Sequence, residues 1–332
     1  MRSPAVNLLL AAILTANLVP FNDLGPRPYD YGYFGGLWED GSNTIPADHL
    51  AAGLERARRI QPLDANGKPS PNGKIVFLAA GFAETQKIFD DFTAAAKSDP
   101  RFKSDSVVFA NAAVPGYETW RWAQPWDSNY NRVKNYVLAP ARVTEKQVQA
   151  VWMEVVTNTP YSPLPIQDSD AYRLKGDIAY ALRTLKEKYP NLQIVYLSSR
   201  VYGGYATTSW NPEPYAYEAV LSVRWIVVGQ VLTMRQAAIG PYWDTRIGDI
   251  NYEKGIAPWT TWGPYLWANG TTPRSDGLTW ERADFESDGE TISERGAAKA
   301  SNLMLRFFLH EPTAAGWLTT GVAPARPRAV AH

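Results

Sequence analysis

Apolar residues in this chain gather in short continuous runs that alternate with longer amphipathic stretches. Strands buried on both faces of a parallel sheet look like this, whereas half-exposed strands alternate apolar and polar positions. Four runs predict buried strands, at 74–80, 106–110, 150–156 and 193–198. Stretches with the helical spacing of apolar residues predict helices, at 48–59, 84–97, 171–188, 215–232 and 293–309.

The order of these elements indicates the fold class. Strand and helix alternate from residue 74 onward, which predicts a parallel sheet with helices on both faces. We therefore expect an α/β fold, a three-layer α/β/α sandwich with a flavodoxin-like strand order, as one domain over 21–320 with a tail at 321–332. Two segments lack periodicity and are rich in Gly, Pro and aromatic residues, so we expect irregular structure at 20–45 and 233–291.

The first twenty residues differ from the rest of the chain. Met1 and Arg2 precede an apolar run at 6–19, which has the length of the hydrophobic part of a signal peptide and is too short to cross a bilayer. We favour an export signal over a core element, and expect a secreted or periplasmic protein without stable membrane insertion. The sequence leaves the oligomeric state open.

Composition excludes several kinds of site. The 33 basic and 33 acidic residues balance without a basic run, so nothing indicates nucleic acid as a partner. Cysteine is absent, which excludes disulfides and thiolate chemistry. Histidine occurs only as His49, His310 and His332, without metal-ligand spacing, and no Gly-rich phosphate loop is present. We expect neither a metal nor another cofactor.

In a parallel sheet, ligands bind where the loops after the strands converge. Here Gly81-Phe82-Ala83 follows the first strand, NAAVPG (111–116) follows the second, and Asp288-Gly289 precedes the last helix. With the motifs NDLGPRPY, YLSSRVYGGYATT, GPYLWANG and SDGETISERGAAK, this layout resembles the SGNH (GDSL-like) hydrolase family, in particular a secreted bacterial branch. The resemblance runs from about residue 21 to 318.

The resemblance implies an esterase site whose serine follows the strand-ending glycine by two residues, and whose Asp and His lie three residues apart. Ala83 occupies the serine position, and Thr291, three residues after Asp288, occupies the histidine position. The oxyanion hole would use the Ala83 backbone, Gly116 and Asn158, or Thr157 in place of Asn158. Serine acyl transfer needs an oxygen nucleophile and a base. We therefore expect no ordinary serine esterase activity.

Carboxylates stand beside the substituted positions. Glu84 follows Ala83, Glu290 precedes Thr291, and Glu154 lies late in the third strand. With Asp288, they place three or four carboxyl groups near one crevice, where a pair could act as acid and base on a glycoside. Acidic residues at a helix start also stabilise the helix dipole, and we favour this second interpretation for Glu84 and Glu290.

Arg200 follows the fourth strand. Its guanidinium would either bind an acidic ligand or pair with one of these carboxylates, and we favour pairing. Tryptophans are frequent in the predicted loops, and Trp120 and Trp122 are the candidate ligand-binding rings. Indole rings either stack on sugars or simply pack the loops onto the sheet, and we expect packing for more than half of them.

Three functions stay open from the sequence. The first is an SGNH-like hydrolase by descent, acting on or binding a carbohydrate or carbohydrate-linked ester through an altered site. The second is a non-catalytic carbohydrate-binding protein. The third is a glycan-acting enzyme that uses Glu84, Asp288 and Glu290. In each case the expected partner is a carbohydrate or another small molecule.

Overall fold

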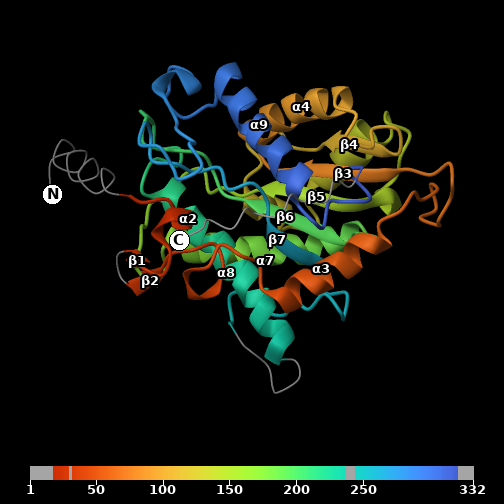
Figure 1. Cartoon of the computed structure of the whole chain (residues 1–332), viewed down its shortest axis with the longest axis horizontal. Helices are drawn as coiled ribbons and strands as arrows, with labels where there is room; N and C mark the ends of the chain where they lie inside the picture. The colour runs from red at the N-terminus through yellow and green to blue at the C-terminus, as the bar shows by residue number, and fades with distance from the viewer. Residues whose placement is uncertain (1–17, 30–31, 237–243, 321–332) are drawn as a thin grey trace, which may run out of the picture.

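The computed structural model describes residues 18–29, 32–236 and 244–320 (Figure 1). Its centre is a sheet of five parallel strands in the order β4-β3-β5-β6-β7. The strands are β3 (Ile75–Ala80), β4 (Val107–Asn111), β5 (Val148–Glu154), β6 (Ile194–Ser198) and β7 (Trp259–Trp262). This is the flavodoxin-like order, so the predicted fold class is confirmed.

Helices cover both faces of the sheet, α4 and α9 above it and α7 and α8 below it in Figure 1. Helix α3 packs beside β6 and β7. The long helices are α3 (Ala47–Arg59), α4 (Ala83–Ser98), α7 (Asp170–Lys188), α8 (Tyr215–Gln236) and α9 (Glu294–His310). Alternate residues of each strand serve the two faces: in β5, Trp152 faces the α4–α9 layer and Met153 faces the α7–α8 layer. Both faces are buried, which explains the continuous apolar runs.

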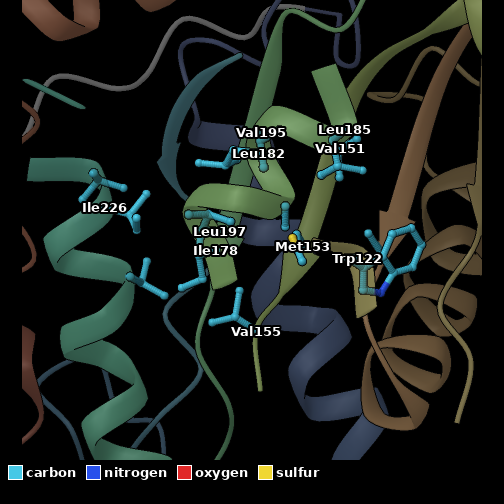
Figure 2. Close-up of a cluster of buried hydrophobic side chains, with 14 of the residues drawn as sticks. Trp122, Val151, Met153, Val155, Ile178, Leu182, Leu185, Val195, Leu197 and Ile226 are labelled. Atoms are coloured by element: carbon cyan, nitrogen blue, oxygen red, sulfur yellow. The ribbon is translucent and has the colours of Figure 1, made fainter. Parts of the chain in front are cut away.

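Figure 2 shows how α7 covers the sheet. Its buried stripe repeats every three to four residues, and it meets the alternate residues of β5 and β6. All these side chains are fully buried: Ile178, Leu182 and Leu185 on the helix, and Val151, Met153, Val155, Val195 and Leu197 on the strands.

Shorter elements fill the rim. The N-terminal segment forms α2 (Phe21–Leu24) and a hairpin of β1 (Pro28–Tyr29) with β2 (Tyr33–Phe34). The loop after β4 forms α5 (Thr119–Trp122), α6 (Ser128–Arg132) and a π-helical turn, Val133–Leu138. Single 3-10 turns occur at Glu39–Gly41, Glu145–Gln147 and Arg282–Asp284.

The predicted strands and long helices are present with ends shifted by a few residues. The expectation of an irregular 233–291 segment is wrong at β7, which pairs with β6 as the edge strand. Two of its four residues are threonines, so the sequence there offers no aliphatic run. The apolar run at 6–19 falls largely outside the residues that the structure describes. Within the described part of the chain, none of the helices combines the length and apolar character needed to span a membrane.

Replacing Leu182 by Ala should lower the free energy of unfolding by about 2–5 kcal/mol, because the fully buried side chain leaves a cavity between α7 and the sheet. The matched control is Glu187→Ala on the same helix, an exposed position where we expect a change below about 0.5 kcal/mol. Urea denaturation followed by circular dichroism measures both. Equal effects of the two substitutions would contradict the core position of Leu182.

Candidate functional site

Arg200 lies at the carboxyl edge of the sheet, two residues after β6, and its guanidinium is buried. Its Nη2 donates to Glu84 Oε2 at 2.9 Å and to the Glu290 carbonyl oxygen at 3.3 Å. Its Nη1 lies 3.4 Å from Glu290 Oε1. All three side chains are nearly inaccessible, with at most 6% of each residue exposed. The pairing that we favoured for Arg200 is therefore present, with two carboxylates instead of one.

Glu154, the last residue of β5, is also part of this buried cluster. Thr85 Oγ1 donates to Glu154 Oε2 at 2.8 Å, and Thr85 itself is held by the Phe82 backbone N–H at 3.1 Å. The remaining oxygens, Glu84 Oε1 and Glu154 Oε1, are both buried without a fixed donor among the described residues. The two carboxyl groups affect each other's ionisation, because two neighbouring buried carboxylates repel.

The surroundings disfavour the charged form of Glu154 more than that of Glu84. Burial and the neighbouring Glu84 charge raise the pKa of Glu154 well above its usual range. Burial also opposes the charged form of Glu84, but the charge of Arg200 and its hydrogen bond outweigh it, so the pKa of Glu84 is lowered. The cluster thus favours a charged Glu84 beside Arg200 and disfavours a charged Glu154.

Glu290 and Asp288 belong to the turn before α9 and have separate roles. Thr208 Oγ1 donates to Glu290 Oε2 at 2.7 Å, and burial raises the pKa of Glu290 above its usual value despite Arg200. Asp288 accepts the Thr291 hydroxyl at 2.6 Å and the backbone N–H groups of Glu290 and Thr291, each at 2.9 Å. Asp288 and Thr291 therefore bind each other within one turn.

This turn is packed tightly against the loop after β6. The Thr207 backbone N–H donates to the Asp288 carbonyl oxygen at 2.9 Å. Gly289 has φ +71°, and a Cβ there would lie 1.8 Å from the Tyr205 carbonyl oxygen, so only glycine fits. Turn geometry and close packing therefore explain the sequence Asp288-Gly289.

The start of α4 and the turn before α9 lie side by side although about 200 residues separate them. Arg200 bridges Glu84 and Glu290, and Lys87 Nζ donates to the Ile292 carbonyl oxygen at 2.9 Å. Ala83, the first residue of α4, is partly exposed, as is Thr291. The positions that the resemblance assigns to nucleophile and base therefore belong to two adjacent segments of this edge.

The predicted oxyanion residues follow the neighbouring strands. Gly116 lies in the exposed turn after β4, with φ +80°, and Val114 N–H of the same turn donates to Gly81 O at 3.4 Å. Asn158 follows β5 and donates its backbone N–H to Glu118 Oε2 at 2.7 Å. Its carboxamide has no hydrogen bond to any residue in the described part of the chain, and the side chain is partly exposed.

Tryptophan positions divide into core and rim. Trp122 is fully buried and donates Nε1 to Gly81 O at 3.4 Å, so its predicted role in binding is wrong. Trp120, two residues earlier, is 44% exposed, and Trp210, after β6, is 56% exposed. Most other tryptophans are part of the core, three of them in strands: Trp38, Trp152, Trp259, Trp262, Trp267, Trp280 and Trp317 are buried.

Tyr161, after β5, is a third exposed ring at this edge that sequence reasoning missed. The only signal for it was its place in a loop after a buried strand. Arg173 covers one ring face at 4.2 Å. The three loops are joined, because Asn158 N–H binds Glu118 and its carbonyl oxygen accepts the Asn211 N–H at 2.9 Å.

Neither of the two described histidines supplies the missing base. His49 is buried against Trp259, and its Nε2 lies 3.0 Å from the Thr260 carbonyl oxygen, so it packs α3 onto β7. His310 ends α9 and bonds Arg306 O through Nδ1 at 2.7 Å. His332 is outside the described residues. In the ranges that the structure describes, no group of three or more His, Cys, Asp or Glu side chains is arranged to hold a metal ion.

Glu154→Gln and Glu84→Gln should have opposite consequences although the substitution is the same. Glutamine resembles a protonated carboxyl group, and the raised pKa of Glu154 means that its stabilising effect is lost as the pH rises through the folded-state pKa. Glutamine does not become charged at high pH, so Glu154→Gln avoids this destabilisation. The free energy of unfolding of the variant at pH 8 should therefore equal or exceed that of the natural chain.

Glu84 has a lowered pKa and stabilises the fold above the pKa of the unfolded chain, an effect lost as the pH falls. Glu84→Gln leaves Arg200 half-paired and should cost about 3–5 kcal/mol at pH 8. Urea denaturation at pH 5 and pH 8 measures both variants. An equal loss in the two variants at pH 8 would contradict the raised pKa of Glu154.

No family model matches this chain, and no curated protein matches it. Two solved structures are similar in fold. One, described as an acylhydrolase from Bacteroides fragilis, has 10% identity and a TM-score of 0.35. The match covers 80% of this chain and 95% of the acylhydrolase chain. The other is a carbohydrate esterase family 2 enzyme with a carbohydrate-binding domain from Corynascus thermopiles (Myceliophthora fergusii), with 10% identity and a TM-score of 0.34. The match covers 71% of this chain and 66% of the esterase chain. Similarity at this level assigns no activity.

Proposed function

We propose that this chain is an SGNH-type α/β domain that binds a carbohydrate at the carboxyl edge of its sheet without serine-dependent ester hydrolysis. One observation carries the proposal: Ala83 stands partly exposed at the start of α4, beside a turn in which Thr291 donates its hydroxyl to Asp288. That place in the fold offers no nucleophile and no base. The strand order and the sequence motifs support the SGNH part of the proposal.

The carboxylates are poor candidates for a replacement mechanism. A general acid or base must reach the substrate, or a water bound to it. Glu84 and Glu290 are instead bound to Arg200, and Glu154 is bound to Thr85 and Glu84, all with little exposed surface. These contacts support a structural role for the cluster, so we do not propose a carboxylate-driven glycosidase.

The exposed groups at the edge suit a carbohydrate. Trp120 and Trp210 present rings to solvent from loops on either side of Asn158, whose carboxamide is free of hydrogen bonds within the described ranges. Sugar rings have apolar faces that stack on indole and hydroxyl groups that bind amides. The apolar run at 6–19 supports export, which would place this rim where polysaccharides occur.

Replacing Trp120 and Trp210 together by Ala should weaken carbohydrate binding about 5- to 150-fold, since two stacked rings contribute about 1–3 kcal/mol in total. Isothermal titration calorimetry with xylohexaose, cellohexaose and other neutral oligosaccharides measures the affinity. Tyr180→Ala is the matched control, because this ring is 58% exposed but lies on α7. The proposal fails if no oligosaccharide binds, or if the rim variant binds as tightly as the control.

Fluorophosphonate probes, which label activated serines, should leave the natural chain unlabelled, because Ala83 has no nucleophilic oxygen. A known serine esterase in the same reaction serves as the positive control, with labelling followed by mass spectrometry. Labelling of any single serine would contradict the proposal. Ser42 and Ser199 would be inspected first, although Ser199 is fully buried.

A further inference from the structure

A hollow lies between the N-terminal segment, the stretch after β7 and the C-terminal half of α9. We call it the α9 cavity. Its volume is about 430 Å³, which falls in the range of roughly 300–1,000 Å³ that is typical of small-molecule sites. The side chains that define it come from Asn22 on α2, Pro264 after β7, and Leu303, Arg306 and Phe307 on α9.

The α9 cavity shares no lining residue with the proposed carbohydrate site at Trp120, Asn158 and Trp210. Helix α9 begins at Glu294, next to the turn that holds Asp288 and Glu290. Arg306 lies twelve residues further along, about 18 Å at the helical rise of 1.5 Å per residue. A ligand in one site therefore leaves the other free.

One wall of the cavity is apolar. Leu303 and Phe307 are four residues apart, so they lie on the same side of α9. Both are only partly buried, whereas Met304 and Phe308 on the inner side of the helix have no exposed surface. Pro264 and Leu37 extend the apolar surface from the opposite side. This wall suits a hydrocarbon body more than a sugar.

The charges on the wall leave one cation free. Arg274 is fully engaged: its guanidinium donates to the Tyr265 and Trp267 carbonyl oxygens at 2.8 and 2.9 Å and to both carboxylate oxygens of Asp276. Arg306 is exposed and forms no ion pair with any residue of the described ranges. With Asp276 neutralised by Arg274, the net charge of the lining is positive, and it resides on Arg306.

A free amide completes the cavity. Asn43 uses both ends of its carboxamide, donating to the Asn22 carbonyl oxygen at 2.7 Å and accepting from Leu37 N–H at 3.2 Å. The Asn22 carboxamide has no hydrogen bond to the residues that the structure describes. It can therefore turn either its NH₂ group or its oxygen toward a bound molecule.

We infer that the α9 cavity binds a small carboxylic acid with an aromatic or branched aliphatic body. The carboxylate pairs with Arg306, because a guanidinium matches the two carboxylate oxygens with parallel hydrogen bonds. The hydrocarbon body packs against Leu303, Phe307 and Pro264. Asn22 binds the second polar group of the ligand, or the carboxylate itself. This site is independent of the carbohydrate site proposed above.

The test is calorimetric titration of the full chain with 3-phenylpropionate and with its neutral counterpart, 3-phenylpropan-1-ol. The acid should bind about tenfold more tightly, as expected for one charge-assisted pair. Arg306→Gln should remove this preference. Arg58→Gln should preserve it, because Arg58 is likewise an exposed helical arginine without an ion pair among the described residues, but lies on α3.

A second variant tests the location. Leu303→Trp fills the cavity and should weaken both compounds, with the folded state verified by near-ultraviolet circular dichroism. Absence of binding to the natural chain would overturn the inference, as would equal affinities for acid and alcohol. Loss of binding in the Trp120/Trp210 double variant, with Arg306→Gln unaffected, would assign the acid to the carboxyl edge instead and also overturn it.

Discussion

The buried guanidinium of Arg200 is the group on which the carboxyl edge of the sheet depends. A charge with 2% exposed surface is tolerated only when it is paired and hydrogen-bonded, since removing one partner of a buried pair costs several kcal/mol. Its partners, Glu84 and Glu290, lie 116 and 90 residues away in the sequence. Arg200 therefore joins the first turn of α4 to the turn before α9, the two segments that would hold nucleophile and base in an SGNH hydrolase.

The same pairing determines the state of the other carboxyl groups. One buried cation stabilises the charge of Glu84, and the charged form of the nearby Glu154 is disfavoured, because two adjacent carboxylates repel in a site of low polarity. Glu290 is the second carboxyl group beside Arg200, and it accepts a hydrogen bond from Thr208. Groups fixed in this way give a rigid edge, and a rigid surface loses little conformational entropy when a ligand binds to it.

The sequence predicts the sheet well because each strand except β7 is a continuous apolar run, and burial on both faces permits little else. The pairing of Arg200 was also predictable, since a charged residue directly after a buried strand has few alternatives to a partner. The hydrogen bonds of Glu154 were not, because its partner Thr85 lies 69 residues away and the contact depends on strand order. Trp120 and Trp122 show a further limit. In a helix of four residues the sequence does not indicate which ring points inward.

Helix α9 shows how one element can serve two surfaces. Its inner stripe, Ala297, Ala300, Met304 and Phe308, already satisfies the core with the spacing of three and four residues that packing requires. Leu303 and Phe307 lie beside this stripe, where a helix that only packs on a sheet would carry polar residues. Leu37 and Pro264 approach them across the α9 cavity without filling it. An apolar pair that packs on the core but stays partly exposed, next to an Arg306 without an ion pair in the described ranges, has the chemistry of a surface that is completed by a ligand.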